Sequence, residues 1–378
     1  MKKILIVFGT RPEAIKLVPL INKLKKDKYF EVFVCSTGQH REMLKHVLDI
    51  FNVKLDFDLD LMKPNQDLYD ITSNALIRMK EVLDELKPDV LVVQGDTTTA
   101  FTAALAAFYK KIKVAHVEAG LRSYNIFSPY PEEANRRFIT VLTDFNFVPT
   151  NPSKKNLIKE GIDKKKIWMT GNTVIDTIIS AKKLIDDNKE LDSELKNKLT
   201  ELCKNNIFDS KYILITLHRR EKFGQEFRDL LFTIKKIAKK YPAIKFVYPV
   251  HLNPNVKGPV EEILYGIENI FLIEPLEYLP FIYLMKNCFF IMSDSGGIQE
   301  ECFVFEKPII VLRDVTERNE AIKAGYAFLT GTNEDLIINT FSDIVNKLET
   351  GFNYFNTKNP FGDGKASNKI AKVLKNHL

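Results

Sequence analysis

FFIMSDSGGIQEE, residues 289–301, has the pattern of a β-strand, a tight glycine turn and the start of a helix. The apolar run from Phe289 favours a strand, and a helical pattern begins at Ile298, directly after two glycines. Strands that lead through short turns into helices are the building blocks of α/β proteins. The segment therefore predicts one strand–helix unit of an α/β fold.

The same turn is a candidate anion site. Ser295, Gly296 and Gly297 would present backbone N–H groups and a hydroxyl at the positive end of a helix dipole. Glu301, about one turn into the helix, is placed to accept hydrogen bonds from sugar hydroxyls. The combination indicates a pocket for a nucleotide diphosphate.

The strand–helix alternation extends along the whole chain. Strands are predicted at 3–8, 31–37, 90–95, 113–118, 146–149, 167–170, 212–217, 245–250, 270–273, 289–293 and 308–312. Helices are predicted between them, for example at 14–26, 98–110, 132–141, 225–240 and 334–348. This pattern predicts parallel sheets with helices on both faces.

The length of 378 residues exceeds what one core usually supports, so we expect two doubly wound domains. The most polar interval is 186–210, and we place the change of domain before it, giving domains 1–171 and 172–365. Ligands of such sheets lie outside the carboxyl ends of the strands. Two sheets that face each other would bring these ends into one cleft.

Composition excludes several classes of protein. The net charge of +6 is spread along the chain. The basic residues are not interleaved with aromatic residues that could stack on bases, which disfavours nucleic-acid binding. No apolar stretch approaches the ~20 residues of a membrane span, and the N-terminal apolar run is too short for a signal peptide. The four cysteines, Cys35, Cys203, Cys288 and Cys302, have no metal-ligand spacing, so we expect a cytoplasmic protein without a metal site.

GTRPEAIK, residues 9–16, follows the first predicted strand. It is not a GxGxxG fingerprint, so a nicotinamide or flavin cofactor loses its main support. Arg11 and Lys16 bring cations to a strand end, where a guanidinium matches a phosphate. The alternative is that Arg11 forms a surface ion pair.

Three carboxylates share this position at strand ends. Asp96, Glu118 and Glu132 follow or lie close behind apolar strands and together resemble a general acid/base set. Asp96 has a structural alternative as a helix N-cap, and Glu132 as a first-turn carboxylate. Glu118 has no such alternative, because burying a carboxylate at the end of a strand is costly.

Further polar and aromatic residues follow strands in the second half. His218 precedes two arginines, which suits an anionic ligand, whereas His251 is interpreted as a helix cap. Arg318 is expected at the start of a helix, and Phe281 offers an aromatic wall near a base or ribose, or packs in the core.

With these residues assembled, the chain resembles the non-hydrolysing bacterial UDP-N-acetylglucosamine 2-epimerases. The resemblance runs nearly end to end through FGTRPEAIKL, TGQHREML, QGDTTT, HVEAGLR, SPYPEEANR, TGNTVID, HRRE, YPVHLNPNV, EYLPF, SDSGGIQEE and TERNEA. It departs at Leu276, where several relatives have Gln, and at Asn319, which replaces Pro. It implies the GT-B fold, with two facing domains, a deep cleft, and a last helix (366–378) that crosses back to the first domain.

The resemblance also implies a reaction, the reversible C2 epimerisation of UDP-N-acetylglucosamine for envelope polysaccharide synthesis, without a cofactor. Asp96, Glu118, Glu132 and His218 would be catalytic, and the UDP site would comprise Arg11, Lys16, Phe281, Ser295, Gly296, Gly297, Glu301 and Arg318. Some members bind a second UDP-N-acetylglucosamine as activator, here at Gln39, His40 and Arg41. A homodimer is expected.

Four other functions stay open at this point. A GT-B glycosyltransferase would share the UDP pocket but transfer the sugar to an acceptor, and a hydrolysing epimerase would release free sugar. A nucleotide-sugar sensor would bind without turnover. An epimerase for another UDP-2-acetamido sugar would carry similar motifs.

Overall fold

The computed structural model describes residues 1–38, 41–62, 66–218 and 223–378, with the side chains of 41–43 also outside the description. The chain divides into two compact units, one of Met1–Thr177 with Phe361–Leu378 and one of Ile178–Pro360. The first division falls inside helix α7 (Thr173–Asp186). The domain boundaries expected from the sequence, after residues 171 and 365, stay predictions.

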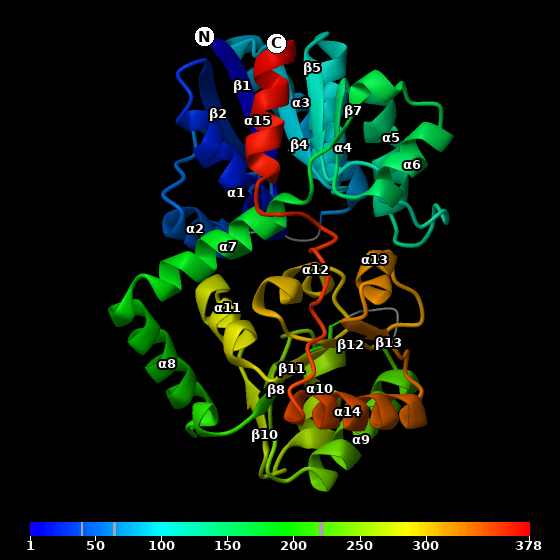
Figure 1. The fold of residues 1–378 in the computed structure, drawn as a ribbon. Coiled ribbons are helices and arrows are strands. Elements are labelled where there is room, and N and C mark those ends of the chain that lie inside the picture. Colours follow the sequence, from blue (N-terminus) through cyan, green and yellow to red (C-terminus); the bar gives the residue numbers. More distant parts are fainter. Residues whose placement is uncertain (39–40, 63–65, 219–222) are drawn as a thin grey trace. The chain divides into compact units, whose positions relative to one another are not determined.

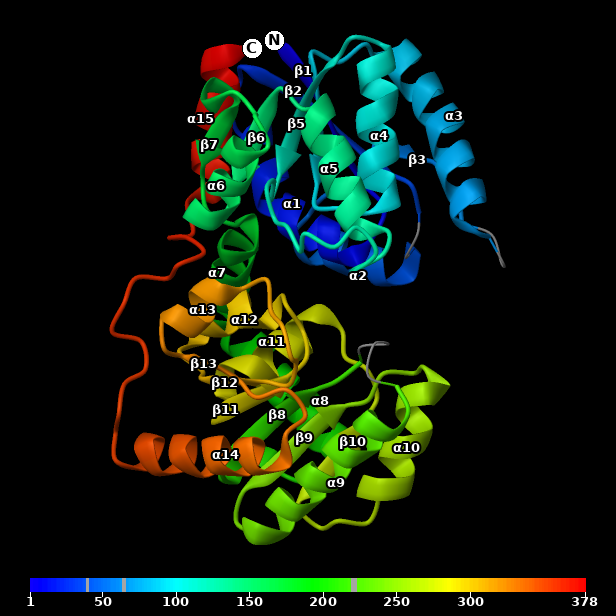
Figure 2. The same cartoon turned by 90° about the vertical axis from the view of Figure 1, so that its right-hand side faces the viewer.

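The first unit is built on a parallel sheet with strand order β3-β2-β1-β4-β5-β6-β7. Its strands are β1 (Lys2–Phe8), β2 (Phe30–Ser36), β3 (Phe57–Asp58), β4 (Val90–Gln94), β5 (Lys113–Val117), β6 (Phe145–Val148) and β7 (Ile167–Met169). Its helices are α1 (Arg11–Lys25), α2 (Arg41–Ile50), α3 (Leu68–Leu86), α4 (Thr98–Tyr109), α5 (Glu132–Leu142), α6 (Asn151–Lys159) and α15 (Ala366–His377). Helix α1 packs against α2 and α15, while α3, α4 and α5 lie side by side (Figures 1 and 2) and share a core with β1 and β4.

The second unit has a parallel sheet of order β10-β9-β8-β11-β12-β13. Its strands are β8 (Tyr212–Thr216), β9 (Lys245–Pro249), β10 (Ile270–Ile273), β11 (Phe290–Ser293), β12 (Ile309–Val311) and β13 (Ala327–Leu329). Its helices are α8 (Lys189–Cys203), α9 (Gln225–Lys240), α10 (Pro254–Leu264), α11 (Tyr278–Asn287), α12 (Ile298–Glu301), α13 (Asn319–Lys323) and α14 (Glu334–Glu349). Helix α9 packs against α10 and α14, and α8 packs against α11.

Two parallel, doubly wound sheets confirm the α/β fold class. Helix α1 begins at Arg11 rather than at the predicted Ala14, because Thr10 is its N-cap and Pro12 suits its first turn. The short strands β3 and β13 were not predicted, since two or three residues carry too little pattern. Among the helices of the described residues, none has the length and apolar composition that a membrane span requires.

Helix α15 begins on a carboxylate that is far away in the sequence. Asp176, buried on α7, accepts hydrogen bonds from the backbone N–H of Ala366 (3.1 Å) and of Ser367 (2.9 Å). The first N–H groups of a helix have no partner inside it, so Asp176 acts as their cap. This contact joins the C-terminal helix to the first unit.

The substitution Asp176→Ala should destabilise the first unit by about 2 kcal/mol, since two buried N–H groups lose their acceptor. Urea unfolding followed by circular dichroism measures the change. Asp363→Ala is the matched control, because Asp363 is an exposed carboxylate beside the same helix start. Equal stability of Asp176→Ala and the control would contradict the capping role.

Candidate active site

Each sheet has one point at which the strand order reverses. In the first unit this point lies between β1 and β4, and in the second between β8 and β11. Helices leave such a point toward opposite faces of the sheet, so a ligand crevice forms at the carboxyl ends of the two strands. The turns that carry Arg11, Asp96, His218 and Ser295 follow these four strands. The sheet topology therefore favours ligand binding where the sequence placed the site residues.

Glu118 is held by two partners directly after β5. The ammonium of Lys16 lies 2.8 and 2.6 Å from its two carboxylate oxygens, and the amide of Asn172 donates to Oε2 at 2.9 Å. Glu118 is 8% exposed, and its φ of 67° lies in the left-handed region that is unusual for a side chain of this kind. Lys16, expected at the phosphates, thus contacts an expected catalytic carboxylate.

Asp96 is held from helix α5. The Nε of Arg136 donates to its Oδ2 at 2.8 Å, and the amide of Asn135 donates to its main-chain oxygen at 2.9 Å. The N-cap of α4 is Thr97, whose hydroxyl oxygen accepts from the N–H of Ala100. The alternative in which Asp96 caps this helix is therefore wrong. The carboxylate of Asp96 remains about a quarter exposed (26%).

Glu132 and its neighbour Glu133 differ in their surroundings. Glu133 is fully buried and accepts from the N–H of Ser123 (3.0 Å) and from Arg136 and Arg137 (3.2 Å each). Glu132 is the first residue of α5 and is half-buried. Glu133 therefore forms buried ion pairs at this helix start, where Glu132 is the first residue.

The glycine turn of the second unit is surrounded by the expected residues. A Cβ added at Gly296 would lie 3.5 Å from the guanidinium carbon of Arg318, and one added at Gly297 would lie 3.6 Å from Oε1 of Glu301. Side chains at these glycines would thus fill space beside a cation and a carboxylate. The structure brings Gly296, Gly297, Glu301 and Arg318 together with Ser295.

Two details of this turn differ from the expectation. The N–H of Ser295 donates to the hydroxyl of Ser293 at 2.9 Å, so it is not a free anion donor. Helix α12 spans only Ile298–Glu301 and continues as a 3₁₀ turn, Cys302–Phe305. A helix this short has a weaker dipole than the sequence suggested. Positive charge at the turn comes chiefly from Arg318, which precedes α13 as predicted.

Arg318 belongs to a chain of buried charges. Its Nε donates to Glu300 at 2.8 Å, and its Nη1 lies 3.7 Å from Glu317, which also binds Arg313 at 3.0 Å. Burial would raise the pKa of Glu317, but the hydrogen bond and charge of Arg313 outweigh it and lower that pKa to about 2. The guanidinium of Arg318 is therefore fixed by carboxylates on two sides.

His218 is fixed by Asp294, a residue that the sequence analysis did not single out. The N–H of His218 donates to Oδ2 of the buried Asp294 at 2.9 Å, and Nδ1 lies 3.4 Å from Oδ1. The rings of His218 and His251 stack with centroids 6.0 Å apart. The cap of α10 is Asn253, so the interpretation of His251 as the cap is wrong.

Phe281 lies half-buried on α11.

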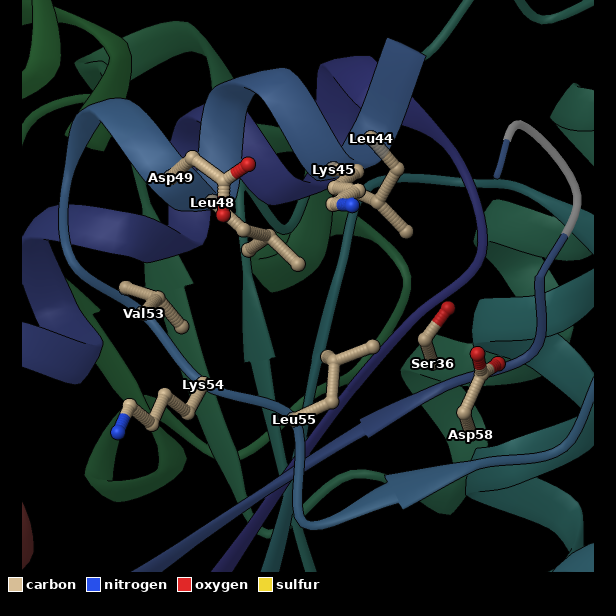
Figure 3. Close-up of a pocket in the computed structure, with 9 residues that line it drawn as sticks. All are labelled: Ser36, Leu44, Lys45, Leu48, Asp49, Val53, Lys54, Leu55 and Asp58. Carbon is tan, nitrogen blue, oxygen red and sulfur yellow. The ribbon is translucent and has the colours of Figure 1, made fainter. Parts of the chain in front are cut away.

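The segment expected for an activator is only partly visible. Gln39 and His40 lie outside the described residues, as does the side chain of Arg41, where α2 begins. A pocket of about 440 Å³ lies against this helix (Figure 3), and its lining contains none of the predicted catalytic or UDP residues. No group of metal-ligating side chains is found in the part of the chain that the structure describes.

Two buried groups near the site were missed from the sequence. Glu13, in the first turn of α1, accepts hydrogen bonds from Thr10 in the turn after β1 and from the hydroxyl of Thr97 after β4. The Nε2 of His116 on β5 lies 2.7 Å from the carbonyl oxygen of Gly95, and burial lowers the pKa of His116 to about 4. The T-x-x-E pattern at Thr10–Glu13 is a capping signal that marks Glu13 as a helix start, although not its burial. No local pattern marks His116.

Comparison with known proteins gives one family. The family model described as UDP-N-acetylglucosamine 2-epimerase matches residues 22–375. A UDP-N-acetylglucosamine 2-epimerase of Campylobacter jejuni is 50% identical over 374 residues, which cover 99% of this chain and 97% of the relative.

Solved structures agree over the same length. A Neisseria meningitidis UDP-GlcNAc 2-epimerase bound to UDP-GlcNAc has a TM-score of 0.93 and 47% identity, covering 99% of this chain and 100% of the other. A Methanocaldococcus jannaschii UDP-GlcNAc 2-epimerase in complex with UDP-GlcNAc and UDP has a TM-score of 0.83 and 34% identity, with 99% of each chain covered. These likenesses confirm the GT-B type of the fold.

His116 should make stability depend on pH. The unfolded chain binds a proton near pH 6.5, whereas folded His116 stays neutral down to about pH 4, so stability is lost as the pH falls through this range. The loss is on the order of 3 kcal/mol. His116→Gln, which cannot titrate at this position, should show a flatter pH dependence of urea unfolding than the wild type. Parallel curves for His116→Gln and wild type would rule out this contribution.

Proposed function

The chain belongs to the UDP-N-acetylglucosamine 2-epimerase family, and we propose that it interconverts UDP-N-acetylglucosamine and UDP-N-acetylmannosamine by inverting C2. The observation that carries the proposal is the position of four expected residues, Arg11, Asp96, His218 and Ser295, after the strands at the order reversals of both sheets. Carboxylates of the first unit would act on the sugar, and the glycine turn of the second would hold the diphosphate. The proposal places both groups on one bound substrate.

The proposed chemistry has two stages. The C1–O bond breaks with its electron pair leaving on UDP, while a carboxylate takes the C2 proton, so that a 2-acetamidoglucal forms. UDP then adds back to C1 as a proton reaches C2 on the other face. No adjacent carbonyl acidifies C2, and a general base contributes only about 10²–10⁴-fold. Stabilisation of the departing diphosphate must supply much of the remainder. The two stages together involve no net oxidation or reduction, so the proposal includes no cofactor.

The contacts of the carboxylates support this assignment. Lys16 and Asn172 donate hydrogen bonds to the carboxylate of Glu118, and Arg136 donates to that of Asp96. A carboxylate must be ionised to accept the C2 proton, and two or more are needed because the proton leaves one face and returns to the other. Arg318, held beside the glycine turn, would neutralise the diphosphate with His218.

Homodimer formation belongs to the proposal as well. The neighbouring helices α3, α4 and α5 expose large apolar side chains, namely Tyr69, Ile77, Phe108, Tyr109, Phe138 and Val141. Phe108, Tyr109 and Val141 also line one surface hollow of about 640 Å³. Exposed apolar surface of this extent is typical of a protein–protein contact. We propose that a second copy of the chain covers this face.

We also propose a cytoplasmic location and the supply of product to envelope polysaccharides. The activator role of the segment Gln39–Arg41 stays a prediction. If UDP-N-acetylglucosamine is an activator, the rate at which the enzyme converts UDP-N-acetylmannosamine should depend sigmoidally on the concentration of added UDP-N-acetylglucosamine.

Asp96→Asn and Glu118→Gln should each lower turnover by about 10²-fold or more while UDP still binds, because they remove a base and leave the second unit intact. The assay follows deuterium entering C2 of UDP-N-acetylglucosamine in D₂O by proton NMR, and calorimetry measures UDP affinity. Glu81→Gln, an exposed carboxylate paired with Arg78, is the control. Near-normal exchange in both active-site variants would reject the assignment.

A lysine placed in the apolar face should disrupt the dimer. Val141→Lys and Phe108→Lys are expected to weaken self-association by about 10-fold or more in sedimentation velocity, because each would bury an unpaired charge. Phe232→Lys, at an exposed phenylalanine on α9, should leave association unchanged. A monomeric wild type, or dimerisation unaffected by both substitutions, would refute this face as the interface.

A further inference from the structure

Glu13 connects the two turns at the strand-order reversal of the first unit. Its Oε2 accepts hydrogen bonds from the N–H of Gly9 (3.1 Å) and from the N–H and hydroxyl of Thr10 (2.8 Å each). Its Oε1 accepts from the hydroxyl of Thr97 at 2.7 Å. Gly9 and Thr10 follow β1, whereas Thr97 follows β4. One carboxylate thus spans the point at which the crevice is expected.

Helix capping explains only half of these contacts. Helix α3 has the same arrangement, in which Asp67 and Asp70 exchange hydrogen bonds (2.9 and 3.2 Å), but there both side chains are exposed. Glu13 is 2% exposed and reaches a residue 84 positions along the chain. Burial raises the pKa of Glu13, against the effect of its hydrogen bonds, so its burial is costly. The exposed Asp70 shows that a carboxylate can cap a helix without being buried, so capping alone does not explain the burial of Glu13.

The contact with Thr97 acts on the neighbouring Asp96. The hydroxyl oxygen of Thr97 accepts from the N–H of Ala100, so its hydrogen points to Glu13. Asp96 is held on its other side by Arg136 and Asn135 of α5. Contacts from two different helices, α1 and α5, therefore fix the turn that carries this carboxylate.

We propose that Glu13 is a positioning residue for the epimerase reaction, one that sets the Asp96 turn, through Thr97, against the start of α1, the helix that carries Arg11 and Lys16. The inference rests on the proposed function. Glu13 itself need not touch the substrate. Misplacing a reacting group by about 1 Å can cost about 10²-fold in rate. Loss of the Glu13–Thr97 hydrogen bond should therefore slow the chemical step more than it weakens substrate binding.

Glu13→Gln tests the proposal with little change in shape. A glutamine has one acceptor oxygen, so its amide cannot accept from both the Thr10 side and the Thr97 side. We expect kcat and C2 deuterium exchange to fall by about 10-fold or more, with KM changed by less than about threefold. A role in folding alone would lower the amount of folded enzyme and leave kcat per folded molecule unchanged.

Thr97 supplies a matched pair of variants. Thr97→Val removes the donor and should lower kcat as Glu13→Gln does, whereas Thr97→Ser keeps the hydroxyl and should retain activity. Both substitutions break the same hydrogen bond, the one between Glu13 and Thr97. The double variant Glu13→Gln/Thr97→Val should therefore be about as slow as the slower single variant. Multiplying losses would show that the two residues act separately and would overturn the proposal.

Asp70→Asn is the control for capping, since it removes a carboxylate from the same helix position of α3, where it is exposed. Its kcat should equal that of the wild type. Wild-type kcat in Glu13→Gln, or a rise in KM with kcat unchanged, would refute positioning by Glu13.

A readout without substrate separates this inference from the proposed function. In Glu13→Gln the N–H of Ala100, which Thr97 binds, should exchange with solvent at least about 10-fold faster by NMR. Unchanged exchange would overturn the Glu13 link whatever the activity. Failure of the wild type to exchange the C2 proton of any UDP-2-acetamido sugar would overturn the proposed function, and the Ala100 measurement would still decide the link.

Discussion

The removal of carboxylates from water is the constraint on which the first unit depends. A buried carboxylate destabilises a fold unless donors or cations surround it. Glu13, Glu118 and Glu133 are each less than a tenth exposed, and each has several partners at the carboxyl edge of the sheet. These partners come from α1, α5 and the turns between strands and helices. The acids therefore join the loops that the sheet alone would leave independent.

In the second unit the buried carboxylates also have partners, but here they hold positively charged side chains and a histidine in place. There the central groups are cations and an imidazole, and the carboxylates Glu300, Glu317 and Asp294 hold them. An arginine whose side chain is fixed before a phosphate arrives loses less conformational freedom when it binds. Each unit thus orders its own candidate site residues by internal ion pairs.

Much of this was predictable from local sequence. Helix α9 begins and ends as predicted, and the strand-end positions of Arg11, Asp96 and Ser295 follow from the apolar runs before them. The partners could not be predicted, because the Lys16–Glu118 and Glu13–Thr97 contacts join residues far apart in the sequence. The short length of α12 was also not predictable, since its helical pattern continues into residues that form a 3₁₀ turn. Motifs locate the candidate site, whereas tertiary packing decides which charges meet.

Glu118 shows how such packing can sustain an unfavourable backbone. Its φ of 67° costs a residue with a Cβ roughly 1–2 kcal/mol, and glycine would avoid that cost. Gly120 lies two positions further, where a Cβ would clash with the carbonyl oxygen of Ser153, so this turn already uses glycine where backbone contact demands it. Residue 118 is not a glycine, and its carboxylate forms contacts at the end of β5. The contacts of that side chain, with Lys16 and Asn172, offset the strain only while the carboxylate is present. The contacts of Glu118, made from this unfavourable backbone, fit its assignment to the candidate site.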